Sequence, residues 1–169
     1  MRPTSGKVLA ALFSILRSAS LEGEDFLDLF SGTGEAAMEA LKRGAKRVLC
    51  VESDSTRERI ISTRLSAYVS ALPAEQNDGL NAECVRRDAR RAIPNLATEG
   101  REFGVVFADP PYNMGWGVIL PALMEENWNI VSSGGVFVFE RSSREEPAEI
   151  SIPRDDRVYG DTILSFYWK

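Results

Sequence analysis

Short runs of strand length alternate with amphipathic stretches along this chain, and this alternation limits the folds open to it. The five runs are Phe26–Phe30, Arg47–Glu52, Ala82–Arg87, Phe103–Ala108 and Val136–Glu140. Apolar residues at helical spacing separate them. Strands that alternate with helices form a parallel sheet with helices on both faces. The expected fold class is therefore α/β, with a doubly wound sheet.

The expected helices lie between these strands and ahead of the first one. They are an opening helix with Val8, Leu12 and Leu16 on its apolar face, then Gly34–Arg43, Ser55–Ser70, Ala89–Ala97 and Val118–Glu126. Residues 73–80, rich in turn formers, are expected to form a loop. Ile150–Ile152 and Thr162–Trp168 are two further strand candidates, which would form a terminal hairpin. A length of 169 residues predicts one domain over 1–169, with a helical segment in residues 1–20 packed on it.

The chain contains no histidine, which excludes catalytic triads and metal sites that need an imidazole. Its two cysteines, Cys50 and Cys84, are too few for a disulfide framework and lack the spacing of a zinc site. Both are expected to be core thiols, and no metal is expected. No stretch has the length of a membrane span and no secretory signal is evident, so the expected location is cytoplasmic.

The net charge of −5 and the isoelectric point near 4.9 count against a nucleic-acid substrate, because an acidic surface repels phosphates. The charge is nevertheless uneven, with basic clusters in residues 1–20 and 84–91. Their candidate phosphate contacts are Arg2 and Lys7 in the first cluster, and Arg86, Arg87, Arg90 and Arg91 in the second. A charge cluster is more often a solvated face, so both interpretations stay open here.

A loop with two glycines, residues 28–34 (Asp-Leu-Phe-Ser-Gly-Thr-Gly), joins the first strand to a helix. Gly32 and Gly34 allow a tight turn and a close approach to a ligand, and the helix N-terminus offers free N–H groups. Glu52 ends the second strand, where a carboxylate accepts hydrogen bonds from both ribose hydroxyls. Together with Ala37, the glycines also match a dinucleotide fingerprint. These residues alone leave nicotinamide or flavin cofactors and S-adenosylmethionine equally open.

Two further carboxylates bear on the cofactor. Asp28 stands directly before the glycines and favours S-adenosylmethionine, whose amino-acid end carries an ammonium group. Asp88 follows the third strand and is a candidate to hold the exocyclic amine of adenine. An equally good interpretation of Asp88 is that it caps the helix that follows.

The fourth strand runs into Asp109-Pro110-Pro111-Tyr112, and this loop favours chemistry on an amino group. Two prolines stiffen the loop, which lies at the carboxyl edge of the sheet where such folds bind ligands. Asp109 and the Pro110 carbonyl would accept the two N–H bonds of an amine on a flat base, while Tyr112 stacks on the ring. The two acceptors would aim the nitrogen lone pair at a methyl donor. Catalysis would then be positioning and electrostatics, without a strong base.

These motifs resemble those of class I S-adenosylmethionine-dependent methyltransferases that act on amino groups. Longer stretches resemble one branch, the RsmD-like 16S rRNA guanine-N2 methyltransferases. These stretches are Arg2-Pro3-Thr4, residues 28–34, residues 39–45 and Tyr159-Gly160-Asp161-Thr162, and the resemblance covers nearly the whole chain. The Asp-Pro-Pro-Tyr motif is less specific, because adenine-N6 enzymes of DNA and RNA share it.

The resemblance implies a seven-stranded, mostly parallel sheet with an antiparallel last strand. It also implies S-adenosylmethionine as cofactor and 16S rRNA or the small ribosomal subunit as partner. It assigns the cofactor to Asp28, Ser31, Gly32, Gly34, Glu52 and Asp88, and catalysis to Asp109, Pro110, Pro111 and Tyr112.

Three other functions stay open at this point: an adenine-N6 methyltransferase, an oxidoreductase that uses NAD, and a cofactor-binding interaction module without catalysis. Members of the resembled family usually carry a short basic segment ahead of the Arg-Pro-Thr motif, and this chain starts at the motif. Three explanations therefore stay open: the basic clusters suffice to bind RNA, a partner protein compensates, or the substrate differs from that of the family.

Overall fold

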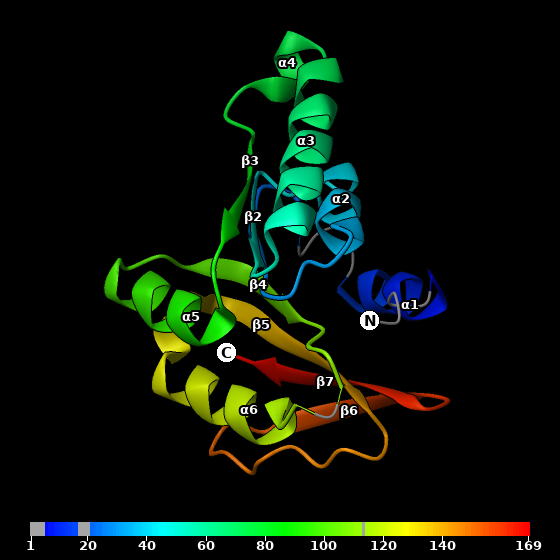
Figure 1. Cartoon of the computed structure of the whole chain (residues 1–169), viewed down its shortest axis with the longest axis vertical. Coiled ribbons are helices and arrows are strands. Elements are labelled where there is room, and N and C mark those ends of the chain that lie inside the picture. The colour runs from blue at the N-terminus through cyan, green and yellow to red at the C-terminus, as the bar shows by residue number, and fades with distance from the viewer. Residues whose placement is uncertain (1–5, 17–20, 113) are drawn as a thin grey trace.

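A seven-stranded sheet forms the centre of the computed structural model, which describes residues 6–16, 21–112 and 114–169 (Figure 1). The strand order is β3-β2-β1-β4-β5-β7-β6. The bounds are β1 Asp25–Asp28, β2 Arg47–Glu52, β3 Asn81–Arg86, β4 Phe103–Ala108, β5 Val131–Ser142, β6 Arg154–Tyr159 and β7 Thr162–Trp168. Strands β1 to β5 pair in parallel, while β7 runs antiparallel to β5 and β6. The predicted sheet, with its antiparallel last strand, is confirmed.

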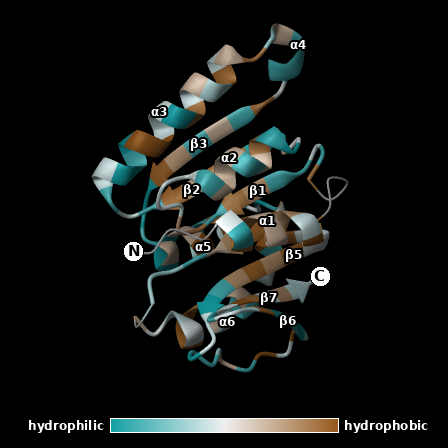
Figure 2. Cartoon of the chain, turned by 90° about the vertical axis from the view of Figure 1, so that its right-hand side faces the viewer, coloured by the Kyte–Doolittle hydropathy of each residue, from teal (hydrophilic) through white to brown (hydrophobic). Residues whose placement is uncertain are grey.

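Helices cover both faces of this sheet. Helices α1, α2 and α3 pack around the hydrophobic core of one face, and α5 and α6 pack around the core of the other. The bounds are α1 Gly6–Leu16, α2 Glu35–Lys42, α3 Ser55–Ala71, α4 Ala74–Asn77, α5 Ala89–Thr98, α6 Trp116–Glu126 and the 3-10 helix η2 Trp128–Ile130. Figure 2 shows α1, α2 and α3 together with the predominantly hydrophobic strands they cover. The short helix α4 lies inside the segment 73–80, for which the sequence predicts a loop.

Strand β5 is longer than the predicted Val136–Glu140. Gly134 and Gly135 lie inside the strand, where the register of its pairing with β4 shifts. A Cβ on Gly135 would lie 2.8 Å from the carbonyl oxygen of Gly104 in β4. A side chain at this position would collide with the backbone of β4, so the irregular pairing requires glycine here.

The prediction of a strand at Ile150–Ile152 is wrong. These isoleucines pack against the core under α5 and α6, and they belong to the segment 143–153 that joins β5 to β6. The N–H of Ser151 donates to the carboxylate of Glu125 in α6, at 2.7 Å, instead of pairing with a strand. Contacts with α6 therefore fix this segment.

The parallel strands β1, β2, β3 and β4 place their carboxyl ends at one edge of the sheet. The described residues that follow them are 29–34, 53–54, 87–88 and 109–112. Ligands of open α/β sheets bind at this edge, near the point where the strand order reverses. In this sheet the order reverses between β1 and β4, so the glycine loop and the Asp-Pro-Pro-Tyr loop are neighbours.

Candidate cofactor and catalytic site

The loop after β1 wraps around the carboxylate of Glu52, the last residue of β2. The Gly32 N–H donates to Glu52 Oε2 at 3.0 Å, and the Asp54 N–H donates to Oε1 at 2.9 Å. Gly32 and Gly34 have φ angles of 53° and 76°, a region that favours glycine. Gly34 caps α2 without any side-chain hydrogen bond, so the first N–H groups of the helix face the loop. The structure thus brings Gly32 and Glu52 together as predicted.

Arg57 is a site residue that the sequence analysis missed. Its Nη2 lies 3.3 Å from Glu52 Oε1, and the side chains of both residues line a cleft at this edge of the sheet. Glu52 itself is only 4% exposed. The guanidinium therefore compensates the charge of a buried carboxylate and fixes its orientation. The only sequence signal is its position in the first turn of α3, five residues after Glu52.

Asp28 ends β1 with a buried carboxylate that lacks a well-formed hydrogen bond. Burial is the main cause that raises its pKa, to about 7, and the negative charge of Asp109 adds to the effect. The Phe30 N–H and the Ser31 hydroxyl interact with the carboxylate and offset only part of the rise in its pKa. Next to it, Ser31 donates its hydroxyl to the Asp28 backbone carbonyl at 2.9 Å. A buried carboxylate with such weak hydrogen-bonding support suits a cationic ligand, and the ammonium group of S-adenosylmethionine is such a cation.

A cleft of about 520 Å³, its open mouth included, lies between these loops. Of the predicted cofactor and catalytic residues, Glu52, Asp88 and Pro111 line it. The remaining lining includes a cluster of packed rings and a guanidinium: Phe30 meets Trp116 edge to face at 4.7 Å, and Arg90 lies 4.4 Å above the Trp116 ring. This apolar wall beside acidic residues fits a purine base attached to a ribose.

Asp88 has the capping role that the sequence left open. Its carboxylate accepts the Arg90 N–H at 2.8 Å at the start of α5. It lines the cleft as well, with its second oxygen 3.6 Å from Arg90 Nη1. The side chain is about half exposed, so capping and ligand binding are compatible.

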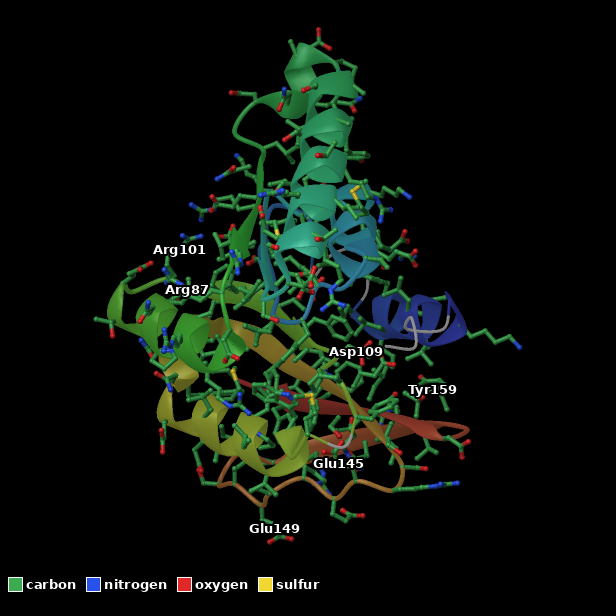
Figure 3. All side chains as sticks on the ribbon, in the orientation of Figure 1. Arg87, Arg101, Asp109, Glu145, Glu149 and Tyr159 are labelled. Atoms are coloured by element: carbon green, nitrogen blue, oxygen red, sulfur yellow. The ribbon has the colours of Figure 1, made fainter. Side chains whose placement is uncertain are left out.

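The Asp-Pro-Pro-Tyr loop leaves the sheet beside the glycine loop. Asp109 is half-buried near the middle of the molecule (Figure 3), within electrostatic reach of Asp28. Pro110 is buried, whereas the ring of Tyr112 is 39% exposed. An exposed ring next to a half-buried carboxylate offers a flat ligand a stacking surface and a hydrogen-bond acceptor.

The predicted basic residues do not form one group. Arg87 and Arg90 line the cleft, while Arg86 and Arg91 are exposed outside it. Lys7 is exposed in the first turn of α1, on the other face of the sheet. Arg2 lies outside the described residues.

Two findings concern ligands and membranes. The described residues contain no cluster of histidine, cysteine, aspartate and glutamate side chains able to hold a metal ion. None of the helices over residues 6–16, 21–112 and 114–169 is long and apolar enough to cross a membrane.

Cys50 is buried, Cys84 is partly buried, and both are free thiols in register on β2 and β3.

Solved structures of similar shape share the fold of this chain. An RNA methyltransferase from Salinibacter ruber, solved with S-adenosyl-L-homocysteine, matches with a TM-score of 0.70 at 16% identity, over 99% of this chain and 93% of that chain. A hypothetical protein from Thermus thermophilus matches with a TM-score of 0.78 at 26% identity, over 98% and 87% of the two chains. The fold and the site define a class I S-adenosylmethionine-dependent methyltransferase, which confirms the predicted cofactor.

The sequence then gives the family within this class. The family model described as "Conserved hypothetical protein 95" matches residues 1–168, and the chain belongs to this family of RsmD-like methyltransferases. "Ribosomal RNA small subunit methyltransferase D" of Escherichia coli K12 is 31% identical over 135 residues, which are 80% of this chain and 58% of that protein. The protein of the same name from Haemophilus influenzae is 30% identical over 129 residues, 76% of this chain and 62% of that protein. The chain thus spans about three fifths of the length of these relatives.

Proposed function

We propose that this methyltransferase modifies the exocyclic N2 amine of a guanine in small-subunit rRNA. The observation that carries the proposal is that Asp109 lies within electrostatic reach of the buried Asp28 carboxylate, where the neighbouring strands β1 and β4 end. An acceptor for the target amine and an acceptor for the cofactor ammonium would then stand side by side. Relatives named as small-subunit rRNA methyltransferases support the choice of RNA.

The cofactor contacts follow from the geometry of the cleft. Glu52, held by the Gly32 N–H and by Arg57, would accept the ribose hydroxyls. Asp88 would accept the adenine amine, and Asp28 would pair with the ammonium group. Ser31 and Gly34 would shape the glycine loop around the amino-acid end of the cofactor. S-adenosylmethionine supplies an activated methyl group when it is bound.

The reaction on the target amine would use the Asp-Pro-Pro-Tyr loop. Asp109 and the Pro110 carbonyl would each accept one N–H of the amine, while Tyr112 stacks on the base. Accepting both hydrogens directs the nitrogen lone pair out of the plane of the base. As the N–C bond forms, the methyl–sulfur bond of the donor would break and the nitrogen would take up the positive charge. The Asp109 carboxylate would stabilise that charge, and the nitrogen proton would then leave to solvent water. This account needs no histidine base.

The experiment that tests the function is the transfer of labelled methyl groups to 16S rRNA and to assembled small subunits. Digestion to nucleosides should give labelled N2-methylguanosine. Labelled N6-methyladenosine would contradict the guanine assignment and support an adenine-N6 enzyme instead, and no transfer to either substrate would contradict the RNA substrate. Comparison of the two substrates also shows whether free rRNA or the assembled particle is preferred.

The raised pKa of Asp28 predicts that cofactor affinity depends on pH. Pairing with the ammonium requires the ionised carboxylate, yet at pH 6 an acid with a pKa of about 7 is roughly one-tenth ionised. The dissociation constant of S-adenosylmethionine should therefore fall nearly tenfold between pH 6 and pH 7.5, as measured by calorimetry. The variant Asp28→Asn should bind more weakly and lose this dependence. An equally steep pH dependence in the variant would contradict the role of Asp28.

The same shift predicts how the stability of the ligand-free protein changes with pH. The folded pKa of Asp28 lies above the value of about 4 expected in the unfolded chain, so the folded state keeps a proton that the unfolded chain releases. This contribution therefore lowers stability as the pH rises from about 4 to about 7, by at most about 1.4 kcal/mol per pH unit. Urea titrations over this range should show a smaller loss for Asp28→Asn than for the wild type. Parallel losses would contradict the raised pKa.

A further inference from the structure

A second cavity lies beside the cofactor cleft, between strand β3 and helix α5. We call it the β3–α5 groove, and its volume is about 580 Å³ with its open mouth. Its lining residues are Leu49, Val51, Glu83, Val85, Arg86, Arg87, Ala92, Asn95, Leu96, Glu99 and Arg101. The groove exists because α5 leaves this face of the edge strand β3 partly uncovered.

The floor of the groove is apolar and part of its rim is basic. Leu49, Val51 and Leu96 are buried members of the core under α5. Arg86 and Arg87 follow each other at the carboxyl end of β3, and Arg101 follows α5. Two carboxylates, on Glu83 and Glu99, also line the groove. Arg86 and Arg87 therefore lie at the end of the groove nearest the cofactor cleft. Arg101, after α5, is the third arginine of the rim.

The rim arginines lack the carboxylate partners that half of the described arginines have. Seven arginines lie within 4.0 Å of a carboxylate: Arg43, Arg47, Arg57, Arg90, Arg141, Arg154 and Arg157. In the part of the chain that the structure describes, no carboxylate comes within that distance of Arg86, Arg87 or Arg101. What distinguishes Arg86, Arg87 and Arg101 is that all three line one cavity, where their guanidinium groups are available to an external anion.

The groove adjoins the proposed catalytic region. Arg87 lines both the groove and the cofactor cleft. Figure 3 shows Arg87 and Arg101 on the same side of the molecule, whereas Glu145 and Glu149 lie far from them, below α6. The cleft and the groove therefore share a guanidinium group, and the groove extends from the cleft along α5.

We propose that the β3–α5 groove binds a single-stranded segment of the RNA substrate, outside the nucleotide that is methylated. The guanidinium groups of Arg86, Arg87 and Arg101 contact phosphates, and the floor of Leu49, Val51 and Leu96 takes up a ribose or the edge of a base. This combination of cationic rim and apolar surface is the chemistry by which proteins hold single strands. The inference rests on the proposed RNA substrate and adds where the RNA is held and by which residues.

The test compares two double variants that each remove two positive charges. The double variant Arg86→Ala, Arg101→Ala removes two of the three rim arginines. It keeps Arg87, because that residue also lines the cofactor cleft. Arg59→Ala with Lys42→Ala is the matched control, because both of its side chains lie outside the two cavities. The probe is a fluorescently labelled fragment of 16S rRNA with a single-stranded region, and binding is followed by anisotropy over a salt series.

The rim variant should bind the RNA about tenfold more weakly than the control at moderate salt. The slope of log affinity against log salt should be shallower by about 1.4, since each contact with a single strand contributes about 0.7. Its affinity for S-adenosylmethionine should equal that of the wild type. RNA binding like that of the control would overturn the groove while leaving the methyltransferase function intact.

Two other outcomes also decide the question. If the wild-type chain neither binds nor methylates rRNA, the groove proposal falls together with the proposed substrate. If the rim variant binds free RNA normally but methylates assembled subunits poorly, the groove holds a ribosomal protein rather than RNA, and the proposal is overturned.

Discussion

Replacing Asp109 by alanine should lower the rate of methyl transfer about 10²–10³-fold, while binding of S-adenosylmethionine stays within a few-fold of the wild type. The expected loss is that of one positioned hydrogen-bond partner in a catalytic site. Asp109 follows β4 next to Asp28 and is assigned to the target amine, whereas Glu52 and Asp88 carry the cofactor contacts. Single-turnover transfer to rRNA at saturating cofactor measures the effect on the chemical step.

Two further variants sharpen this test. Asp109→Asn keeps one accepting oxygen but loses the negative charge, so its rate should fall between the wild type and the alanine variant. Asp78→Ala removes an aspartate of the loop before β3, away from the cleft, and should leave the rate unchanged. A wild-type rate for Asp109→Ala would remove the residue from catalysis.

Replacing Glu52 by alanine should raise the dissociation constant of S-adenosylmethionine about 10- to 150-fold. Loss of a charge-assisted, bidentate contact costs about 1.5–3 kcal/mol. The removal also leaves the guanidinium of Arg57 without its carboxylate and the Gly32 N–H without its acceptor. Calorimetric titration measures the change, and circular dichroism checks that the variant is folded.

The control for Glu52 is Glu75→Ala, which removes an exposed carboxylate on α4. Glu52→Ala removes both the carboxylate and its ion pair with Arg57. Arg57→Ala removes only the ion pair, so the carboxylate remains but is no longer held in one orientation. This variant should weaken the cofactor less than Glu52→Ala does. Equal affinities of the wild type and Glu52→Ala would exclude Glu52 from the ribose site.

The buried parts of the sheet were the most predictable from sequence. Strands β2 and β4 have the predicted bounds, because their central residues are buried on both faces and read as continuous apolar runs. Strand β6 was missed, since most of its residues are exposed and its sequence, Arg-Asp-Asp-Arg-Val-Tyr, has no apolar pattern. An edge strand of this kind is defined by its partner, here β7, rather than by its own residues.

In the candidate site, too, some features were predictable from the sequence and others were not. The glycine loop and Glu52 were predictable, because backbone conformation and strand ends leave marks in the sequence. The ion pair between Arg57 and Glu52 depends on which way a long side chain turns from α3, and sequence does not encode that directly. The β3–α5 groove arises from how far α5 covers β3, a packing property of two separate elements.

The pairing of β1 with β4 also has a consequence for how the molecule folds. Phe26 pairs with Val105, and the residues between them form two complete β-α units of their own. Such distant pairing is slow, because loop-closure entropy is lost before the contacts form. We expect β1, β2 and β3 to associate early, with the glycine loop and Glu52 already in place, and β4 to dock later with Asp109. Hydrogen exchange pulse-labelling during refolding would then show amides of β2 protected before those of β4. A newly made chain would on this account acquire its cofactor contacts before its catalytic loop, and methyl transfer would be the last of its properties to appear.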